Sequence, residues 1–399
     1  MLFSQVGKNC CGCSACIHIC PKQALRFEEN EEGFIYPQLE KSKCINCNLC
    51  VQVCPVVNQD NEKIPIRVYA AKNFDTNIRF NSSSGGIFSL LAENIIDDNG
   101  VVFGAKFNSR WEVVHDYTDT KENLALFRGS KYVQSYLGNS FKQVEEFLKT
   151  GRKVLFTGTP CQVAGLKKYL RRDYPNLITV DFVCHGVPSP KIWKMYLKEE
   201  ICRHYKDQES NIILESDDIS LVESINFRNK SHGWKNFHIL LRFCKKNKGE
   251  SHHVEVSQCF ADNPYMQAFL NNLSLRHSCY NCPAKSGKSG SDFTIGDLWG
   301  SSHICPQFDD DKGISLVFVN KCTPYANLSC DLIEVNYEDA IVDNICVRQS
   351  VKQPINRDFF YHLIKKETFN NSLIEATSSH LPHRLKRLFF RKIQRKGGK

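Results

Sequence analysis

Two cysteine runs of identical spacing lie within the first 58 residues of the chain. Cys10, Cys13, Cys16 and Cys20 precede Pro21, and Cys44, Cys47, Cys50 and Cys54 precede Pro55. In the spacing C-x2-C-x2-C-x3-C-P, three close thiolates wrap one iron–sulfur cubane and the fourth reaches a second cubane. We therefore predict two 4Fe–4S clusters whose ligand sets cross between the runs: Cys10, Cys13, Cys16 and Cys54 for one cluster, and Cys44, Cys47, Cys50 and Cys20 for the other.

The cysteine content indicates metal ligation. The chain has 20 cysteines in 399 residues and no recognisable secretory signal, so disulfides are the poorer explanation. A pair of four-cysteine zinc sites is the alternative for the two runs, because such sites also use C-x2-C spacing. Eight cysteines without ligand-like spacing are predicted to be packing residues: Cys11, Cys202, Cys244, Cys259, Cys305, Cys322, Cys330 and Cys346.

Composition excludes several classes of protein. The chain is 42% hydrophobic and 24% charged, as in a soluble globular protein, and it lacks an apolar run long enough to span a membrane. Much of the net charge of +9 comes from residues 380–399, which hold basic side chains and no acid. Because neither a membrane span nor a secretory signal is visible, we predict a cytoplasmic protein. Because the rest of the chain is nearly neutral, we predict that it does not bind nucleic acid.

The pattern of apolar residues predicts four regions and a two-part fold class. Residues 1–58 form an α+β ferredoxin-like domain, a polar linker follows, residues 66–150 and 151–345 form an α/β body, and residues 346–399 form a helical, basic tail. Strands are expected at 68–71, 101–107, 153–156, 177–183, 236–244 and 314–319. Helices are expected after Ser84, Ser140, Pro160 and Pro190, and over 264–273.

A second set of cysteines follows strand ends in the body. Cys161 begins a helix after the strand at 153–156, and Cys184 follows the strand at 177–183. If the two strands are parallel neighbours, both thiols emerge at the same carboxyl edge of the sheet. Cys279 and Cys282 form a C-x2-C pair that could reach this edge. From spacing alone, four ordinary cysteines are the open alternative.

Several phrases of the sequence resemble a known family. They are TGTPCQVAGL at 157–166, DFVCHGVPSP at 181–190, SDFTIGDLWG at 291–300, SSSGG at 82–86 and RGSKYVQS at 128–135. The family is the beta subunit of coenzyme F-420 hydrogenases and dehydrogenases, and the resemblance extends over residues 1–345. It implies a bound FAD and a third 4Fe–4S cluster in the body, held by Cys161, Cys184, Cys279 and Cys282.

Further residues are candidates for the flavin and the reaction. The SSSGG turn before a helix could hold the FAD pyrophosphate on free backbone N–H groups, and a plain helix start is the alternative. His185 is a candidate proton donor, with a structural role as its alternative. The flavin candidates are Ser82, Ser83, Ser84, Gly85, Gly86, Lys131, Thr157, Gly158, Thr159 and Asp297.

The predicted function is that of an iron–sulfur flavoprotein oxidoreductase. FAD would convert between one-electron clusters and a substrate that carries a hydride or can be reduced. The resemblance also allows a link to polysaccharide biosynthesis, because members of the family occur beside such enzymes. The alternative is an electron-transfer relay that has no substrate and feeds a partner enzyme. A redox partner protein or a small electron carrier is expected in either case.

The basic tail carries a separate prediction. Leu385, Leu388, Phe389 and Ile393 lie near one face of a helix, with basic residues between them. Such a helix could bind peripherally to the anionic inner face of a membrane. The alternative is a terminal helix that is solvated or that packs its apolar face on the body.

Overall fold

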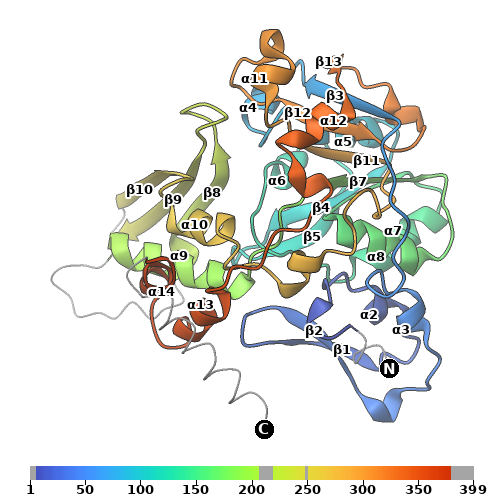
Figure 1. Cartoon of the computed structure of the whole chain (residues 1–399), viewed down its shortest axis with the longest axis horizontal. Coiled ribbons are helices and arrows are strands. Elements are labelled where there is room, and N and C mark those ends of the chain that lie inside the picture. Colours follow the sequence, from blue (N-terminus) through green and yellow to red (C-terminus); the bar gives the residue numbers. More distant parts are fainter. Residues whose placement is uncertain (1–5, 206–218, 248–249, 379–399) are drawn as a thin grey trace.

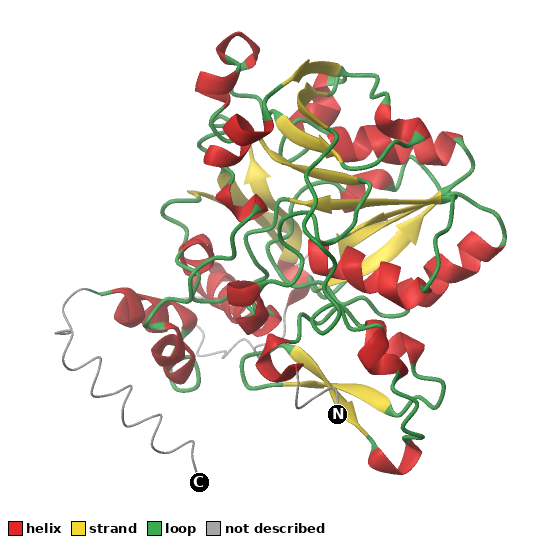
Figure 2. Cartoon of the chain, turned by 45° about the vertical axis from the view of Figure 1, so that its right-hand side comes forward, coloured by secondary structure: helices red, strands yellow, loops and turns green. Residues whose placement is uncertain are grey.

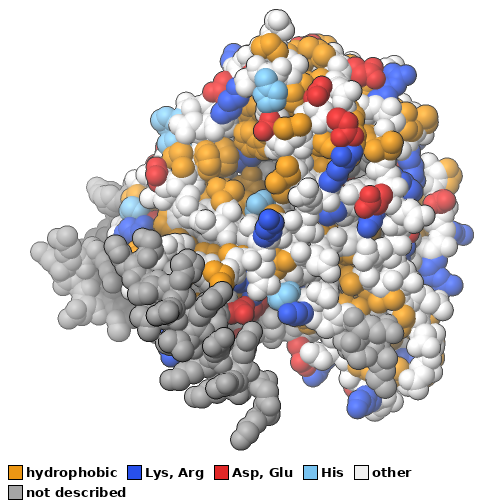
Figure 3. Space-filling model, viewed as in Figure 1, with side chains coloured by type: hydrophobic (Ala, Val, Ile, Leu, Met, Phe, Trp, Pro, Cys, Tyr) orange, Lys and Arg blue, Asp and Glu red, His pale blue; other side chains and the backbone are white. Residues whose placement is uncertain are grey.

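The computed structural model describes residues 6–205, 219–247 and 250–378. Figure 1 shows three parts: a small N-terminal unit, a body built on a large sheet, and a lobe beside it that has its own sheet. The predicted basic tail lies outside the described residues. No helix in the described ranges is long and apolar enough to cross a membrane. On the face shown in Figure 3, basic and acidic side chains are interspersed.

The N-terminal unit contains a hairpin and two short helices. Strands β1 (Leu25–Glu29) and β2 (Ile35–Leu39) pair antiparallel. The helices are α2 (Ala15–Ile19) and α3 (Leu49–Gln52), and each carries the third cysteine of its run. This ferredoxin-like architecture agrees with the prediction for this region.

The body is built on a mixed sheet of eight strands in the order β13-β3-β12-β11-β7-β6-β4-β5. The four central strands β4, β6, β7 and β11 are parallel, and the flanking pairs are antiparallel. The strands are β3 (Arg67–Lys72), β4 (Val101–Phe107), β5 (Val113–Thr118), β6 (Val154–Thr157), β7 (Leu177–Phe182), β11 (Phe293–Asp297), β12 (Ser315–Val319) and β13 (Asp331–Glu334).

Helices cover both faces of the sheet (Figure 2), as alternation of apolar side chains along the strands requires. Phe103 and Phe156 pack on one face with α7 (Ser140–Lys149) and α8 (Pro160–Leu170). Val102 and Leu155 point to the other face and pack on α5 (Ile87–Asp97). The first face also receives Cys11, Cys13, Ala15 and Val53, so the N-terminal unit shares the core of α7 and α8.

The side lobe was not predicted. Its antiparallel sheet contains β8 (Val222–Asn229), β9 (His238–Asn247) and β10 (Glu250–Cys259). The strand predicted at 236–244 therefore belongs to this lobe and not to the main sheet. An aromatic core that includes Trp193 and Tyr265 joins the lobe to α9 (Pro190–Tyr205), α10 (Pro264–Leu270), α13 (Arg357–Leu363) and α14 (Phe369–Thr377).

Four short helices complete the body. They are α4 (Thr76–Phe80), α6 (Leu124–Phe127), α11 (Ser301–Ile304) and α12 (Tyr337–Val342). The predicted body strands correspond to β3, β4, β6, β7 and β12, and the predicted helices to α5, α7, α8, α9 and α10.

Candidate functional site

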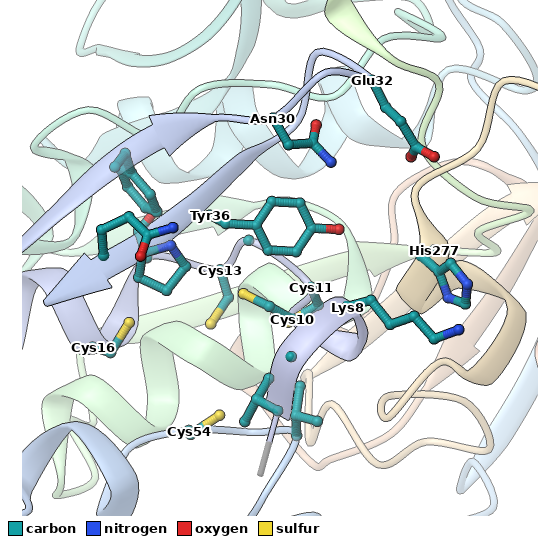
Figure 4. Close-up of a pocket in the computed structure, with 18 residues that line it drawn as sticks. Lys8, Cys10, Cys11, Cys13, Cys16, Asn30, Glu32, Tyr36, Cys54 and His277 are labelled. Atoms are coloured by element: carbon teal, nitrogen blue, oxygen red, sulfur yellow. The ribbon is translucent and has the colours of Figure 1, made fainter. Parts of the chain in front are cut away.

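The structure gathers the N-terminal cysteines into the two crossed sets that their spacing predicts. Figure 4 shows the first set around a cavity of about 490 Å³, which is lined by Cys10, Cys13, Cys16 and Cys54. A second cavity of about 60 Å³ is lined by Cys20, Cys44, Cys47 and Cys50. We call these the inner and the outer cysteine sets, because the inner set lies against the body and Cys47 of the outer set is exposed.

The backbone repeats between the two runs. Gly12 and Ser14 have positive φ angles of 73° and 66°, and Asn46 and Asn48 at the equivalent positions have 54° and 59°. Left-handed residues between the cysteines turn the chain sharply, so successive thiols point to a common centre. The three non-glycine residues in this conformation are Ser and Asn, and Asn tolerates it better than most residues.

Ionisation of three of these thiols, Cys16, Cys50 and Cys54, is unfavourable without a bound cation. Burial, together with the neighbouring thiols Cys10, Cys54 and Cys50, raises the pKa of Cys16. Burial likewise raises the pKa of Cys54 and of Cys50. A metal centre reverses this preference, because it supplies positive charge and binds thiolates. The donor set is therefore suited to iron–sulfur clusters.

The third cysteine set also converges. Strands β6 and β7 are parallel neighbours, so Cys161 at the start of α8 and Cys184 after β7 emerge at the same carboxyl edge. The segment carrying Cys279 is joined to the loop after Cys184, since the Val187 N–H donates to Cys279 Sγ at 3.4 Å. Burial is the main cause of the raised pKa of Cys184, and the nearby thiols of Cys279, Cys282 and Cys161 raise it further.

The four thiols of the third set lie within electrostatic range of one another. Burial raises the pKa of Cys279 to about 12 and that of Cys282 to about 11, and the neighbouring thiol of Cys161 contributes to both shifts. Within the described residues, no three His, Cys, Asp or Glu side chains form a group that would hold a single metal ion. The assignment of this third cysteine set to a cluster stays a prediction.

Two cysteines predicted to be packing residues lie at the third set. Cys11 is buried between the inner and third sets, where its thiol interacts with both Cys13 and Cys161. Cys346 Sγ lies 3.7 Å from His185 Nδ1, and Lys285 Nζ donates to the carbonyl oxygens of Cys184 and Cys346 at 2.5 Å each. The packing prediction is thus incomplete for Cys11 and Cys346. Neither has ligand-like spacing, which is why the sequence did not reveal them.

His185 is held inside the protein. Its Nε2 atom lies 2.7 Å from Asn272 Oδ1, and its ring packs edge-on against Phe269. Burial lowers the pKa of His185, so the ring is mostly neutral at pH 7. With both ring nitrogens near protein groups, the contacts favour the structural alternative over a proton donor.

Part of the predicted flavin set converges at the carboxyl edge of the central strands. Ser83 Oγ accepts from the Ser130 N–H at 2.7 Å, next to Lys131. Lys131 is half-buried, and its Nζ donates to the carbonyl oxygens of Arg128 and Gly129. Burial lowers the pKa of Lys131 to about 7. This cation has no carboxylate partner within the described residues, and an anionic group would stabilise its charged form.

Asp297 joins this group through residues that were not predicted. Arg228 is 4% exposed and forms a two-pronged ion pair with Asp297, at 2.8 and 3.1 Å. Arg228 also donates to Ser83 O and to the hydroxyl of Tyr132. Its Nε is buried without a partner in the described part of the chain. No motif marks Arg228, because β8 comes from the unpredicted lobe.

Thr157, Gly158 and Thr159 connect the flavin candidates to the third cysteine set. The Thr157 carbonyl lies 3.0 Å from His115 Nε2, and the Gly158 N–H donates to Val180 O. Thr159 forms a capping box at the start of α8, and its Oγ1 lies 3.2 Å from Cys161 Sγ. This turn therefore contacts the third cysteine set through Thr159, and Thr157 contacts His115, which lies within electrostatic range of Lys131.

The SSSGG turn packs against the sheet, and its Gly85 N–H is already hydrogen-bonded within the protein. The Gly85 N–H donates to Ser315 Oγ at 2.9 Å, and a Cβ there would lie 2.2 Å from Ala71 O. The side chains of Ser82 and Ser84 donate to Ile78 O and Ile314 O. Gly86 begins α5 with a φ of 86°, next to Asn73. Gly85 thus permits close packing on β3 and β12, and its N–H is not free for a phosphate.

Comparisons with known proteins cover all three cysteine sets. Residues 9–58 match the 4Fe-4S dicluster domain, and residues 151–324 match the family described as the C terminus of the coenzyme F420 hydrogenase/dehydrogenase beta subunit. No curated protein matches significantly. Among solved structures, a chain of the F420-reducing NiFe hydrogenase complex from Methanosarcina barkeri is 16% identical over 80% of this chain and 93% of that one, with a TM-score of 0.41. The predicted resemblance is confirmed: residues 9–58 carry the dicluster domain, and residues 151–324 carry the C-terminal domain of the beta-subunit family.

Proposed function

Since the chain joins a 4Fe-4S dicluster domain to the C-terminal domain of a coenzyme F420 hydrogenase/dehydrogenase beta subunit, it is an iron–sulfur electron-transfer protein, and we propose that it is a flavoprotein oxidoreductase. Electrons would pass between the outer, inner and third clusters and FAD. FAD supplies the exchange between single electrons and a hydride. The substrate would be a small molecule that is reduced or oxidised by two electrons.

One observation carries this proposal: the three cysteine sets and the flavin candidates are contiguous. Cys11 contacts both Cys13 of the inner set and Cys161 of the third set. Thr159 then contacts Cys161, and its neighbour Thr157 contacts His115, whose environment includes Lys131. Such a sequence of contacts leads from the exposed Cys47 to the carboxyl edge of the sheet, where α/β proteins bind their ligands.

The side chains of the edge would bind and orient the flavin. Lys131 and Arg228 offer positive charge to its anionic groups, and Arg228 Nε has an unused donor within the described part of the chain. Asp297 fixes the Arg228 guanidinium through two hydrogen bonds, so this donor is held in one direction. Burial disfavours a charged Lys131, and a bound anion would compensate for that cost.

Anaerobic purification with iron, sulfide and flavin analysis tests the proposal. The protein should hold about twelve iron atoms, four in each of three cubanes, together with FAD. Cys279→Ser should remove about four iron atoms, because the outer and inner sets do not use this residue. A full complement of iron in that variant would contradict the assignment of Cys279 to a third cluster. Iron without flavin, even after reconstitution with FAD, would favour the relay that lacks a substrate.

A further inference from the structure

A buried arginine lies between the inner and third cysteine sets. Arg276 has no exposed surface and lies in the segment between α10 and the turn that carries Cys279. Its Nε donates to Cys10 O at 2.6 Å, and one Nη donates to Ile35 O at 2.9 Å. Its guanidinium also lies 4.3 Å from the centre of the Tyr36 ring, which points into the inner cavity (Figure 4).

The same residue is close to the third set. The Arg276 N–H donates to Val187 O, and its own carbonyl accepts from the Cys279 N–H at 2.9 Å. Its positive charge acts on the thiols of Cys161 and Cys279. Arg276 therefore contacts the backbone of one cysteine set and lies within electrostatic range of the other.

No carboxylate of the described residues compensates the charge of Arg276. Its side-chain acceptors are two carbonyl oxygens and Gln134 Oε1 at 2.9 Å, and it forms no ion pair with the described residues. Two other buried arginines differ: Arg228 pairs with Asp297, and Arg357 pairs with Glu32. A buried charge without a partner is unfavourable, so a counter-ion is expected at Arg276.

We propose that Arg276 is the shared counter-ion of the inner and third clusters and marks the junction where an electron crosses between them. A cubane held by four thiolates is a net anion and becomes more negative when reduced, so a nearby fixed cation stabilises its reduced state. In the transfer, the inner cluster loses one electron and the third cluster gains it, or the reverse, and no bond forms or breaks. The inference rests on the proposed clusters.

Three variants test the role of the Arg276 charge. Arg276→Gln removes it, Arg276→Lys keeps it, and Gln134→Glu places a carboxylate against the guanidinium with almost no change of shape. Arg79→Gln is the matched control, because Arg79 is also a buried arginine, and neither it nor its ion-pair partner Asp310 lines a cysteine cavity. The readout is the midpoint potential of each cluster in an anaerobic redox titration followed by electron paramagnetic resonance.

Both Arg276→Gln and Gln134→Glu should lower the potentials of the inner and third clusters and leave the outer cluster unchanged. Arg276→Lys and Arg79→Gln should retain the potentials of the unmodified protein. Unchanged potentials in Gln134→Glu, or an equal shift in Arg79→Gln, would overturn the role of the charge. If Arg276→Gln does not fold, Gln134→Glu still decides. Iron analysis separates these outcomes from failure of the proposed function, which would show as missing clusters in the unmodified protein.

Discussion

Cys13 packs directly on Gly165 of α8: a Cβ on Gly165 would lie 2.9 Å from Cys13 Sγ and 2.7 Å from its Cβ. Because Cys161 lies one helical turn earlier on α8, this contact brings the inner and third cysteine sets to the same helix end. The absence of a side chain at Gly165 is what permits the approach.

Gly165→Ala should therefore destabilise the protein. Alanine favours a helix by about 1 kcal/mol over glycine, yet overpacking of a tight contact costs about 1–3 kcal/mol. Steric overlap should win, because the contact is shorter than real Cβ contacts allow. The measurements are the free energy of unfolding and the iron content, with Lys168→Ala as the control, because Lys168 lies on the same helix and its side chain pairs with Asp60. A more stable variant with full iron would show that α8 is not held this closely.

Cys346 and Cys282 should respond differently to substitution. We expect Cys282→Ser to remove about four iron atoms and Cys346→Ser to retain them, because Cys346 contacts His185 and is not in the predicted set. Iron content and the electron paramagnetic resonance spectrum of the reduced protein measure both. Loss of iron in Cys346→Ser with full iron in Cys282→Ser would exchange their roles.

The pair of Glu32 and Arg357 should contribute strongly to the attachment of the N-terminal hairpin. The Arg357 side chain is 1% exposed and the Glu32 side chain 24%, and two hydrogen bonds of 2.8 and 2.6 Å join them. Glu32→Gln leaves the buried cation unpaired, which should cost about 3 kcal/mol. Denaturant unfolding measures the change. The neighbouring pair of Glu31 and Lys365 is exposed, so Glu31→Gln should destabilise the protein far less than Glu32→Gln. Equal effects would contradict the role of burial.

Lys131 gives a prediction for pH dependence. Burial lowers its pKa to about 7 in the folded protein, so the unfolded chain binds more protons between pH 7 and pH 10. Stability of the flavin-free protein should therefore rise with pH through this window, and Lys131→Met should remove that rise. The same variant should bind FAD more weakly if the cation holds the flavin. Unfolding by denaturant at several pH values and titration with FAD test the two effects separately.

The sequence by itself determined the two crossed cysteine sets, because iron ligation is a local matter of spacing within each run, and the hairpin only has to bring the runs together. It also predicted the strands that Cys161 and Cys184 follow, and apolar strands followed by helices favour the parallel pairing that the structure has. The flavin candidates were only partly recognised: Ser83, Lys131 and Asp297 converge, whereas Gly85 is needed for packing on Ala71.

Only the tertiary structure decided the surroundings of these sets. Cys11, Arg228, Arg276 and Cys346 gain their positions from segments far apart in the chain, and no spacing announces such contacts. Arg276 shows the reason: as one arginine among many in the sequence it is unremarkable, and it becomes informative only when folding removes it from water with no carboxylate of the described chain beside it. Burial and charge compensation depend on how the chain packs, whereas the spacing of the cysteine ligands is a property of the amino-acid sequence itself.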